Sequence, residues 1–170
     1  DRLLLDKIYD GKIKIDQIEF NLIDKKFNTV NKDNPYELTN EEKEVIKKLK
    51  ESFLNSQKLK QHISFLLNKG SMYTIFNENL LYHGCVPCEE NGEYCNVNIN
   101  GEFYSGKSLF EKCESIVKNA FFEKQDSDFI WYLWCGSKSP LYGRNKMATF
   151  ESYFVDDKNA AKEIKNHYYT

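Results

Sequence analysis

The 170-residue chain has no marked excess of either charge and no long apolar run. Its 24 basic and 26 acidic side chains give a formal net charge of -2, so the chain lacks the basic excess that drives non-specific nucleic-acid binding. No apolar run approaches the roughly 20 residues of a membrane-spanning helix, and no signal peptide opens the sequence. These absences favour a soluble, cytoplasmic protein with neither a nucleic-acid nor a membrane partner.

Familiar sequence motifs are also scarce. We find no P-loop, no dinucleotide-binding glycine motif and no recognisable nucleophile motif. No Asn-x-Ser/Thr sequon occurs, and five cysteines form an odd set in a chain long enough to fold without disulfides. Reduced thiols in a cytoplasm fit both features. Because the sequence starts at Asp1 and runs directly into three leucines, we expect a piece of a longer chain.

The composition supports one compact domain. Hydrophobic residues make up 41% and aromatic residues 15% of the chain, which is enough for a core and excludes a wholly disordered protein. The first 38 residues combine a short helical pattern, an Asp10-Gly11 turn and an alternating stretch, which predict a small helix followed by extended or helical connections. Pro35 closes this segment. We therefore expect a boundary near residue 38, dividing the chain into 1–38 and 39–170.

A long helical segment follows the boundary. Thr39 and Glu42 have the spacing of a capping box, so a helix is predicted to start there. Asn55-Ser56 is a plausible break, and Gly70 supplies a stop. The positions that keep helical spacing are apolar: Ile46, Leu49, Phe53, Leu59, Ile63, Leu66 and Leu67.

Two hairpins and a second helix are predicted further on. The runs 72–76 and 80–83 flank a polar turn, and the runs 94–99 and 102–104 flank Asn100-Gly101, a dipeptide typical of type I′ turns. A second capping box, from Ser108 to Glu111, predicts a helix of about 14 residues.

The tryptophan-rich apolar run 129–134 has the length of a strand, and we expect Trp131 and Trp134 in the core. Loop-forming residues follow at 136–143. The predicted fold class is α+β: a long helix, at least one further helix, and a small, largely antiparallel sheet built from the two hairpins and the tryptophan run.

Three clusters could carry chemistry. His83 ends an apolar strand and precedes Gly84, where the missing Cβ lets backbone or a ligand approach closely, as a metal or phosphate site would require. A half-buried histidine with both nitrogens bonded to backbone carbonyls is the alternative. Cys85, Cys88 and Cys95 with His83 suggest zinc, although a single C-x₂-C pair equally suits small buried residues.

The third cluster is cationic. Arg144 and Lys146 follow Gly143 in a loop, and a planar guanidinium beside an ammonium suits a phosphoryl group. A solvated loop would have the same composition.

Several stretches of the sequence together resemble the class III (Firmicutes-type) fructose-1,6-bisphosphatases, which belong to the calcineurin-like metallophosphoesterases. The resemblance covers nearly the whole chain, whereas members of that family are several times longer. The stretches that carry it are DKIYDGKI at 6–13, SFLNS at 52–56, GSMY at 70–73, NLLYHGCVP at 79–87, WYLWCG at 131–136, SPLYG at 139–143 and KMATFE at 146–151.

The resemblance implies an internal fragment of a two-metal phosphomonoesterase, typically manganese-dependent, that hydrolyses fructose 1,6-bisphosphate in gluconeogenesis. Its fold would be part of an α/β/β/α sandwich. His83 resembles a late metal ligand of related phosphatases, and Arg144 and Lys146 lie in a loop comparable to one that binds phosphate there. The partners implied are fructose 1,6-bisphosphate, the remainder of the parent chain and, in an oligomer, further copies.

The other motifs of the superfamily are missing. Asp-x-His, Gly-Asp-x-x-Asp-Arg-Gly, Gly-Asn-His-Asp/Glu and the later Gly-His occur nowhere in the sequence, so no catalytic residue is assigned. We expect the chain to be inactive alone, because a lone imidazole holds manganese weakly. The alternatives are a non-catalytic interaction or regulatory module and a small zinc-binding module.

Overall fold

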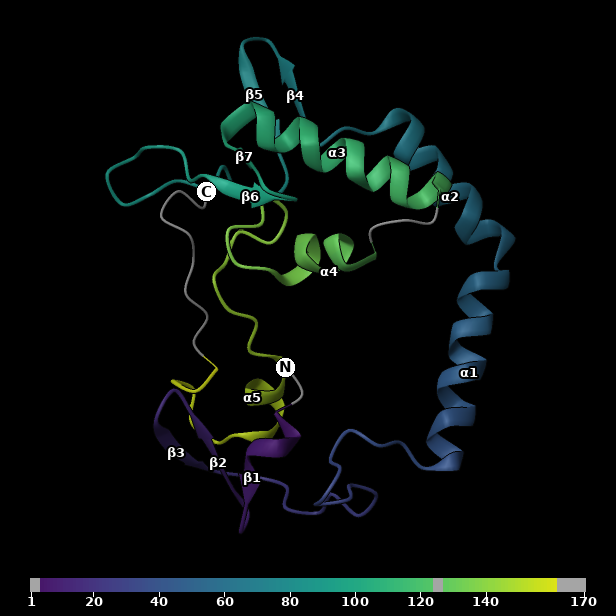
Figure 1. Ribbon diagram of the computed structural model, residues 1–170, viewed down its shortest axis with the longest axis vertical. Coiled ribbons are helices and arrows are strands. Elements are labelled where there is room, and N and C mark those ends of the chain that lie inside the picture. The colour runs from purple at the N-terminus through teal and green to yellow at the C-terminus, as the bar shows by residue number, and fades with distance from the viewer. Residues whose placement is uncertain (1–3, 124–126, 162–170) are drawn as a thin grey trace. The chain divides into compact units, whose positions relative to one another are not determined.

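The computed structural model describes residues 4–123 and 127–161, which fall into two compact units. One unit comprises residues 4–62 and 148–161, and the other comprises residues 63–123 and 127–147. Across these ranges the chain forms five α-helices, a short 3₁₀-helix and three small antiparallel sheets, which confirms the α+β fold class (Figure 1). None of the described helices is long and apolar enough to cross a membrane.

The first unit begins with a 3₁₀-turn and a three-stranded antiparallel sheet in the order β1-β2-β3. Both turns of the sheet have two residues with positive φ, Asp10-Gly11 at 46° and 73° and Asp16-Gln17 at 48° and 70°. The predicted small helix is thus a single 3₁₀-turn, and the connections after it are strands. The elements are η1 (Leu5–Lys7), β1 (Ile8–Tyr9), β2 (Lys12–Ile15) and β3 (Ile18–Asn21).

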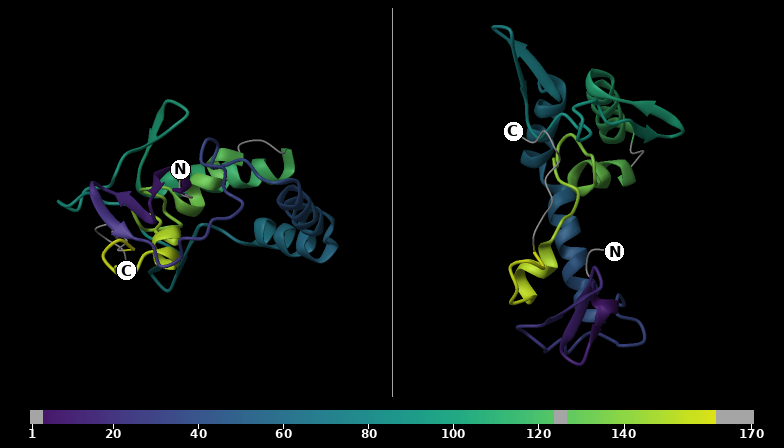
Figure 2. Two further views of the ribbon diagram at one scale, coloured as in Figure 1. Left: turned by 90° about the horizontal axis from the view of Figure 1, so that it is seen from below. Right: turned by 90° about the vertical axis from the view of Figure 1, so that its left-hand side faces the viewer.

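The end of the described chain packs on this sheet. Helix α5 (Thr149–Phe154) leads into Val155, which forms a β-bridge with Leu22, and the Ile23 N–H donates to the Phe154 carbonyl at 2.9 Å. The sheet and α5 lie side by side in both Figure 1 and Figure 2. The buried residues of this core come from both ends of the chain: Leu4, Ile13, Ile15, Leu22, Phe150, Val155 and Ala160. A domain division at residue 38 stays a prediction, but residues 148–161 belong with the N-terminal strands.

Helices α1 (Asn40–Asn55) and α2 (Gln57–Lys69) form the predicted helical segment. The capping box is confirmed, because the Glu42 N–H donates to Thr39 Oγ1 at 3.2 Å and the Thr39 N–H donates to Glu42 Oε2 at 2.8 Å. The break at Ser56 is also confirmed: its backbone is extended, and its hydroxyl accepts from the Leu59 N–H at 3.2 Å. Neither helix has a buried residue.

Both predicted hairpins are present in the second unit. Strands β4 (Tyr73–Phe76) and β5 (Asn79–Tyr82) pair across Asn77-Glu78, and β6 (Val97–Ile99) and β7 (Glu102–Tyr104) pair across Asn100-Gly101. Asn100 and Gly101 have φ of 55° and 91°, as a type I′ turn requires. The prediction of one joint sheet is wrong, because each hairpin forms its own two-stranded sheet.

The tryptophan run is helical, not extended, so the predicted strand over 129–134 is wrong. It forms α4 (Ser127–Cys135), where Phe129, Tyr132 and Leu133 face the core at helical spacing. All six residues of the run are apolar, so their pattern could not separate a strand from a helix. Only packing decides between them. Trp131 and Trp134 are 56% and 61% exposed, which also corrects their expected place in the core.

Helix α3 (Gly106–Glu123) starts two residues before the predicted cap. The Ser108 hydroxyl accepts from the Ser105 N–H at 3.1 Å and donates to the Ser105 carbonyl at 2.8 Å, so a capping box from Ser108 to Glu111 is wrong. The helix packs on β6, β7 and α4. The buried residues of this second core are Val97, Ile99, Leu109, Cys113, Ile116 and Leu133.

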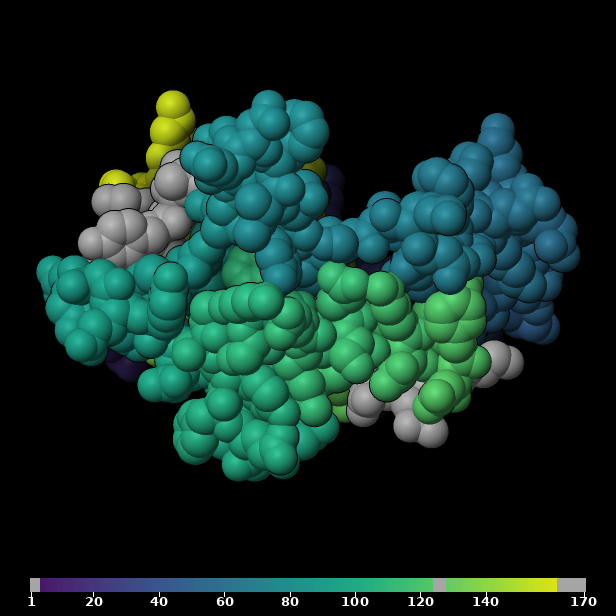
Figure 3. Space-filling model, turned by 90° about the horizontal axis from the view of Figure 1, so that it is seen from above, coloured from purple at the N-terminus to yellow at the C-terminus, as the bar shows by residue number. Residues whose placement is uncertain are grey.

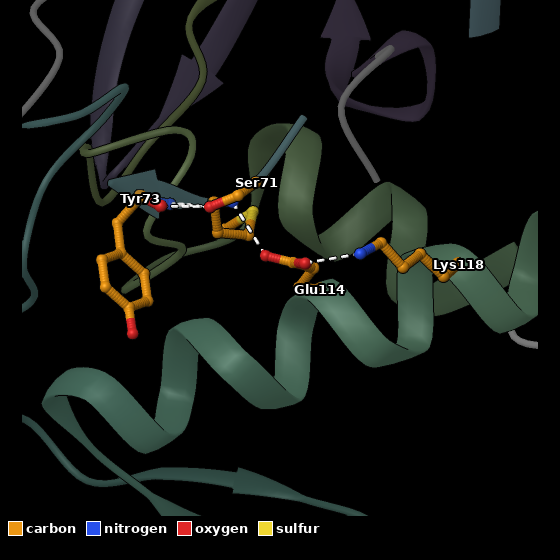
Figure 4. Close-up of polar contacts among 5 residues, drawn as sticks. Ser71, Tyr73, Glu114 and Lys118 are labelled. Carbon is orange, nitrogen blue, oxygen red and sulfur yellow. Dashed lines mark hydrogen bonds and ion pairs between the residues drawn. The ribbon is translucent and has the colours of Figure 1, made fainter. Parts of the chain in front are cut away.

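A partly buried carboxylate joins α3 to the start of the first hairpin. Glu114 Oε2 accepts from the Met72 N–H at 3.0 Å, and Oε1 accepts from Lys118 Nζ at 2.6 Å (Figure 4). On the same segment the Ser71 hydroxyl accepts from the Tyr73 N–H at 3.2 Å. Burial raises the pKa of Glu114, but the hydrogen bonds from Lys118 and Met72 outweigh it and hold that pKa below its ordinary value.

The Glu114 contact predicts a pH-dependent stability. Since the folded-state pKa is lowered, the stabilisation is present above the unfolded-state pKa and is lost as pH falls through the folded-state value. Glu114→Gln keeps an acceptor for Met72 but loses the charge, and we expect it to cost about 1 kcal/mol of unfolding free energy at pH 7. Urea unfolding between pH 7 and 3 measures both effects.

Glu111→Gln is the matched control, because Glu111 is on the same helix, exposed, and 3.4 Å from Lys107 Nζ. We expect it to change stability by a few tenths of a kcal/mol. Equal losses for the two variants, or an unchanged pH profile for Glu114→Gln, would show that the partly buried Glu114 contact does not stabilise the unit.

Candidate functional site

A cleft of about 600 Å³ in the second unit brings two of the predicted site residues together. We call it the His83 cleft. His83 and Arg144 are its two basic lining residues, and both belong to segments for which the sequence predicted a site. The remaining lining residues are Gly84, Val117, Ile130, Leu133, Trp134, Leu141 and Tyr142.

His83 lies at the rim, immediately after β5. Its side chain is exposed and makes no hydrogen bond within the described part of the chain, so the half-buried, backbone-bonded alternative does not describe it. The imidazole is therefore accessible from the cleft. Its role as a metal ligand stays a prediction.

Gly84 is required by the close approach of two backbone segments. A Cβ at this position would lie 2.2 Å from the Pro140 carbonyl oxygen and 2.5 Å from that of Leu141. The next residue completes the contact, because the Cys85 N–H donates to the same Pro140 oxygen at 2.9 Å. Gly84 thus permits a close approach, as predicted, and the group that approaches it is protein backbone. This contact holds His83 beside the loop that carries Arg144.

That loop is organised around the buried Ser139. Its hydroxyl donates to the Leu133 carbonyl at 2.6 Å and accepts from the N–H groups of Leu141 and Tyr142 at 3.2 and 3.3 Å. One side chain therefore ties the end of α4 to the loop and satisfies three backbone groups. The Ser139 carbonyl accepts from the Gly143 N–H at 3.0 Å, which closes the turn before Arg144.

The two predicted cations do not share the cleft. Gly143 has a φ of 68°, and the chain that leaves it places Arg144 among the lining residues. Lys146 is not among them, although its carbonyl accepts from the Tyr142 hydroxyl at 2.8 Å and so ties the far end of the loop to a cleft residue. The structure thus joins His83 to Arg144 and leaves Lys146 outside the lining.

Sequence reasoning missed the aromatic wall of the cleft. Trp134 lines it, and its ring stands edge-on to Trp131 with centroids 5.1 Å apart. Their spacing of three residues on one helix is the signal that could have placed them together, had the run been recognised as helical. With Tyr142, Trp134 gives the cleft an aromatic side next to its two basic residues.

The described residues do not form a metal centre by themselves. No group of three or more histidine, cysteine or acidic side chains in ranges 4–123 and 127–161 is placed to hold an ion. Cys85 and Cys95 are buried, and burial raises the pKa of the Cys95 thiol to about 11, so that thiol is protonated at neutral pH. The zinc alternative therefore gains no support. His83 would be a single metal ligand, whereas a pair of manganese ions needs several ligands.

Comparisons with known proteins give matches to one family over almost the whole chain. A family model described as Firmicute fructose-1,6-bisphosphatase matches residues 1–170. A protein of Clostridium botulinum (strain Langeland / NCTC 10281 / Type F) named fructose-1,6-bisphosphatase class 3 is 48% identical over 99% of the chain and 27% of its own length. A protein of Clostridium novyi (strain NT) with the same name is 49% identical, again over 99% of the chain and 27% of its own length. The chain thus spans about a quarter of these relatives, and no solved structure matches it.

Ser139→Ala tests the organisation of the loop. The substitution removes one donor and one acceptor from a fully buried position and leaves the Leu133 carbonyl and two N–H groups without that partner. We expect a loss of about 1–3 kcal/mol in unfolding free energy. Ser137→Ala, in the same loop but exposed, is the control and should change stability by less than about 0.5 kcal/mol. Equal effects of the two would contradict the role of Ser139.

Gly84→Ala tests the backbone contact. Because its Cβ would collide with two carbonyl oxygens that no side-chain motion can move, we expect a loss of more than about 2 kcal/mol and a displaced 139–143 loop. Gly101→Ala meets no atom within 4 Å and carries only the cost of its left-handed backbone, about 1–2 kcal/mol. Thermal unfolding compares the two. A Gly84→Ala protein as stable as the wild type would show that the segments are not in contact.

Proposed function

Because the chain belongs to the Firmicute fructose-1,6-bisphosphatase family, we propose that it is part of a metal-dependent sugar-bisphosphate phosphatase. The whole enzyme hydrolyses D-fructose 1,6-bisphosphate to fructose 6-phosphate and phosphate, a reaction of gluconeogenesis in the cytoplasm. The observation that carries this proposal is the match of the family model to all 170 residues, supported by 48% identity to a relative of that name.

In this proposal the His83 cleft is a fragment of the active site. His83 offers an imidazole nitrogen at its rim, and a neutral imidazole suits a borderline divalent ion such as Mn²⁺. Bound metal would supply Lewis-acid stabilisation of a phosphoryl oxygen. The other ligands must come from the rest of the enzyme, because the described residues offer no cluster of three donors.

Arg144 is the proposed phosphate-binding residue. It shares the cleft with His83, and its planar guanidinium can donate two parallel hydrogen bonds to a phosphate group. Lys146, two residues further on, would act from outside the lining as an additional positive charge. Trp134 and Tyr142 would give a bound sugar phosphate an aromatic surface beside these basic groups.

The chain alone is proposed to be inactive. It supplies one metal ligand and one cleft cation, and the residues that would activate water and protonate the leaving group lie elsewhere in the enzyme. A non-catalytic interaction module is compatible with this role, because α1 and α2 bury none of their residues.

His83→Ala in the full-length enzyme tests the proposal. We expect it to fold normally, to lose about one metal ion per chain, and to lose at least about 100-fold in activity towards fructose 1,6-bisphosphate, since even indirect perturbation of metal ligands costs 10–100-fold. His62→Ala, an exposed histidine on α2, is the matched control and should keep both metal and activity. Metal analysis and phosphate release measure the two quantities.

Arg144→Ala should retain the metal and lower kcat/KM by about 10–100-fold through a higher KM, because a charge-assisted hydrogen bond to phosphate is lost. If His83→Ala keeps its full metal content and activity, His83 is not a ligand. If the unmutated enzyme shows no metal-dependent release of phosphate from fructose 1,6-bisphosphate, the proposed function is wrong.

A further inference from the structure

Trp134 is the more exposed of the two aromatic side chains that line the His83 cleft. It is 61% exposed, whereas Tyr142 is half-buried and its hydroxyl donates to the Lys146 carbonyl at 2.8 Å. Trp134 and Arg144 both belong to the second unit, so their common place in the cleft does not depend on any other part of the chain. The indole therefore presents a flat apolar surface in the same cleft as a guanidinium group.

The aromatic neighbour of Trp134 leaves at least one face of its indole uncovered. The rings of Trp131 and Trp134 are inclined at 82°, with their centroids 5.1 Å apart. In such a T-shaped pair the edge of one ring meets one face of the other, so the contact occupies at most one of the two faces of Trp134. Because Trp131 lies three residues earlier on α4, the contact also supports the indole from its own helix.

The size and the lining of the cleft suit a ligand that has both an anionic and an apolar part. Its volume of about 600 Å³ lies in the range of small-molecule sites and exceeds what one phosphate group fills. Arg144 offers a positive charge, whereas Ile130 and Leu133 add apolar surface next to Trp134. Phosphate bound by Arg144 alone would leave this apolar surface in contact with water.

A sugar phosphate has both of these parts. The C–H groups of a sugar ring form apolar patches between its hydroxyl groups, and their hydrogens carry a small positive charge. The face of an aromatic ring is the negative region of its quadrupole, so a sugar ring that stacks on an indole gains both apolar burial and electrostatic attraction. Inorganic phosphate has no such surface and gains neither.

We propose that Trp134 determines the specificity of the His83 cleft by stacking on the sugar ring of a bound sugar phosphate, beside the phosphate-binding Arg144. The side chain thereby distinguishes a sugar phosphate from phosphate itself. This inference rests on the proposed function and deepens it, because it assigns recognition of the sugar to one side chain.

The two products of the proposed reaction separate recognition of the sugar from recognition of phosphate. Calorimetric titration of the metal-loaded full-length enzyme with fructose 6-phosphate and, separately, with inorganic phosphate gives a Kd for each. We expect Trp134→Ala to weaken the binding of fructose 6-phosphate about tenfold and to change that of phosphate by less than about twofold, because only the stacked ring loses a contact. Trp134→Phe keeps a flat ring and should weaken fructose 6-phosphate by only about threefold.

Phe103→Ala is the matched control. Phe103 is an aromatic residue of the same unit, 70% exposed on β7 and outside the lining of the cleft. We expect the control to leave both Kd values unchanged. The thermal midpoint of each ligand-free variant is measured alongside, so that a loss of folding is recognised.

Unchanged binding of fructose 6-phosphate by Trp134→Ala would overturn the inference and leave the proposed function in place. An equal loss of affinity for the two ligands would also overturn it, because Trp134 would then support the structure of the protein and not recognise the sugar. Trp134→Phe gives the same comparison if Trp134→Ala does not fold. An unmutated enzyme that neither binds fructose 6-phosphate nor releases phosphate from fructose 1,6-bisphosphate would refute the proposed function and this inference with it.

Discussion

The close passage of Gly84 under the carbonyls of Pro140 and Leu141 is the contact on which the candidate site depends. These positions are more than fifty residues apart in the sequence, and the contact admits no Cβ. Because it joins the end of β5 to the loop after α4, it determines that His83 and Arg144 open into one cleft. Without it, each would be a polar residue on a separate segment.

The buried hydroxyl of Ser139 makes that contact possible. A loop folded against a helix end carries backbone N–H and carbonyl groups that burial would leave without partners, at a cost of about 1–3 kcal/mol each. One serine satisfies three of them, so the loop can lie against α4 with little regular structure of its own. On α3, Glu114 has a similar role, because it holds the start of the first hairpin to the helix.

Large apolar side chains remain at the surface of both units. In the second unit, Ile75, Phe76, Leu80 and Leu81 of the β4–β5 hairpin are 49–67% exposed, and Figure 3 shows the face on which this hairpin and α3 meet solvent. In the first, Val45, Ile46, Leu49 and Phe53 of α1 are 51–65% exposed. This exposure accompanies a chain that spans about a quarter of the length of its relatives.

The sequence by itself determined the elements whose signals are local. The Thr39 capping box, the break at Ser56 and the Asn100-Gly101 turn depend on hydrogen bonds and φ angles within a few residues, and all three are present as expected. The motifs that carry the family resemblance are local in the same sense. The candidate residues His83 and Arg144 were identified in this way, each on its own segment.

Only the tertiary structure decided how those segments meet. An apolar run such as 129–134 satisfies strand and helix patterns alike, and the core that faces Phe129, Tyr132 and Leu133 selects the helix. The weakly patterned residues 148–155 complete the N-terminal core through buried Phe150 and Val155, a β-bridge to Leu22 and a hydrogen bond from the Ile23 N–H to the Phe154 carbonyl. The grouping of His83 with Arg144, and the exclusion of Lys146 from their cleft, likewise depend on contacts between distant residues, which no local pattern encodes.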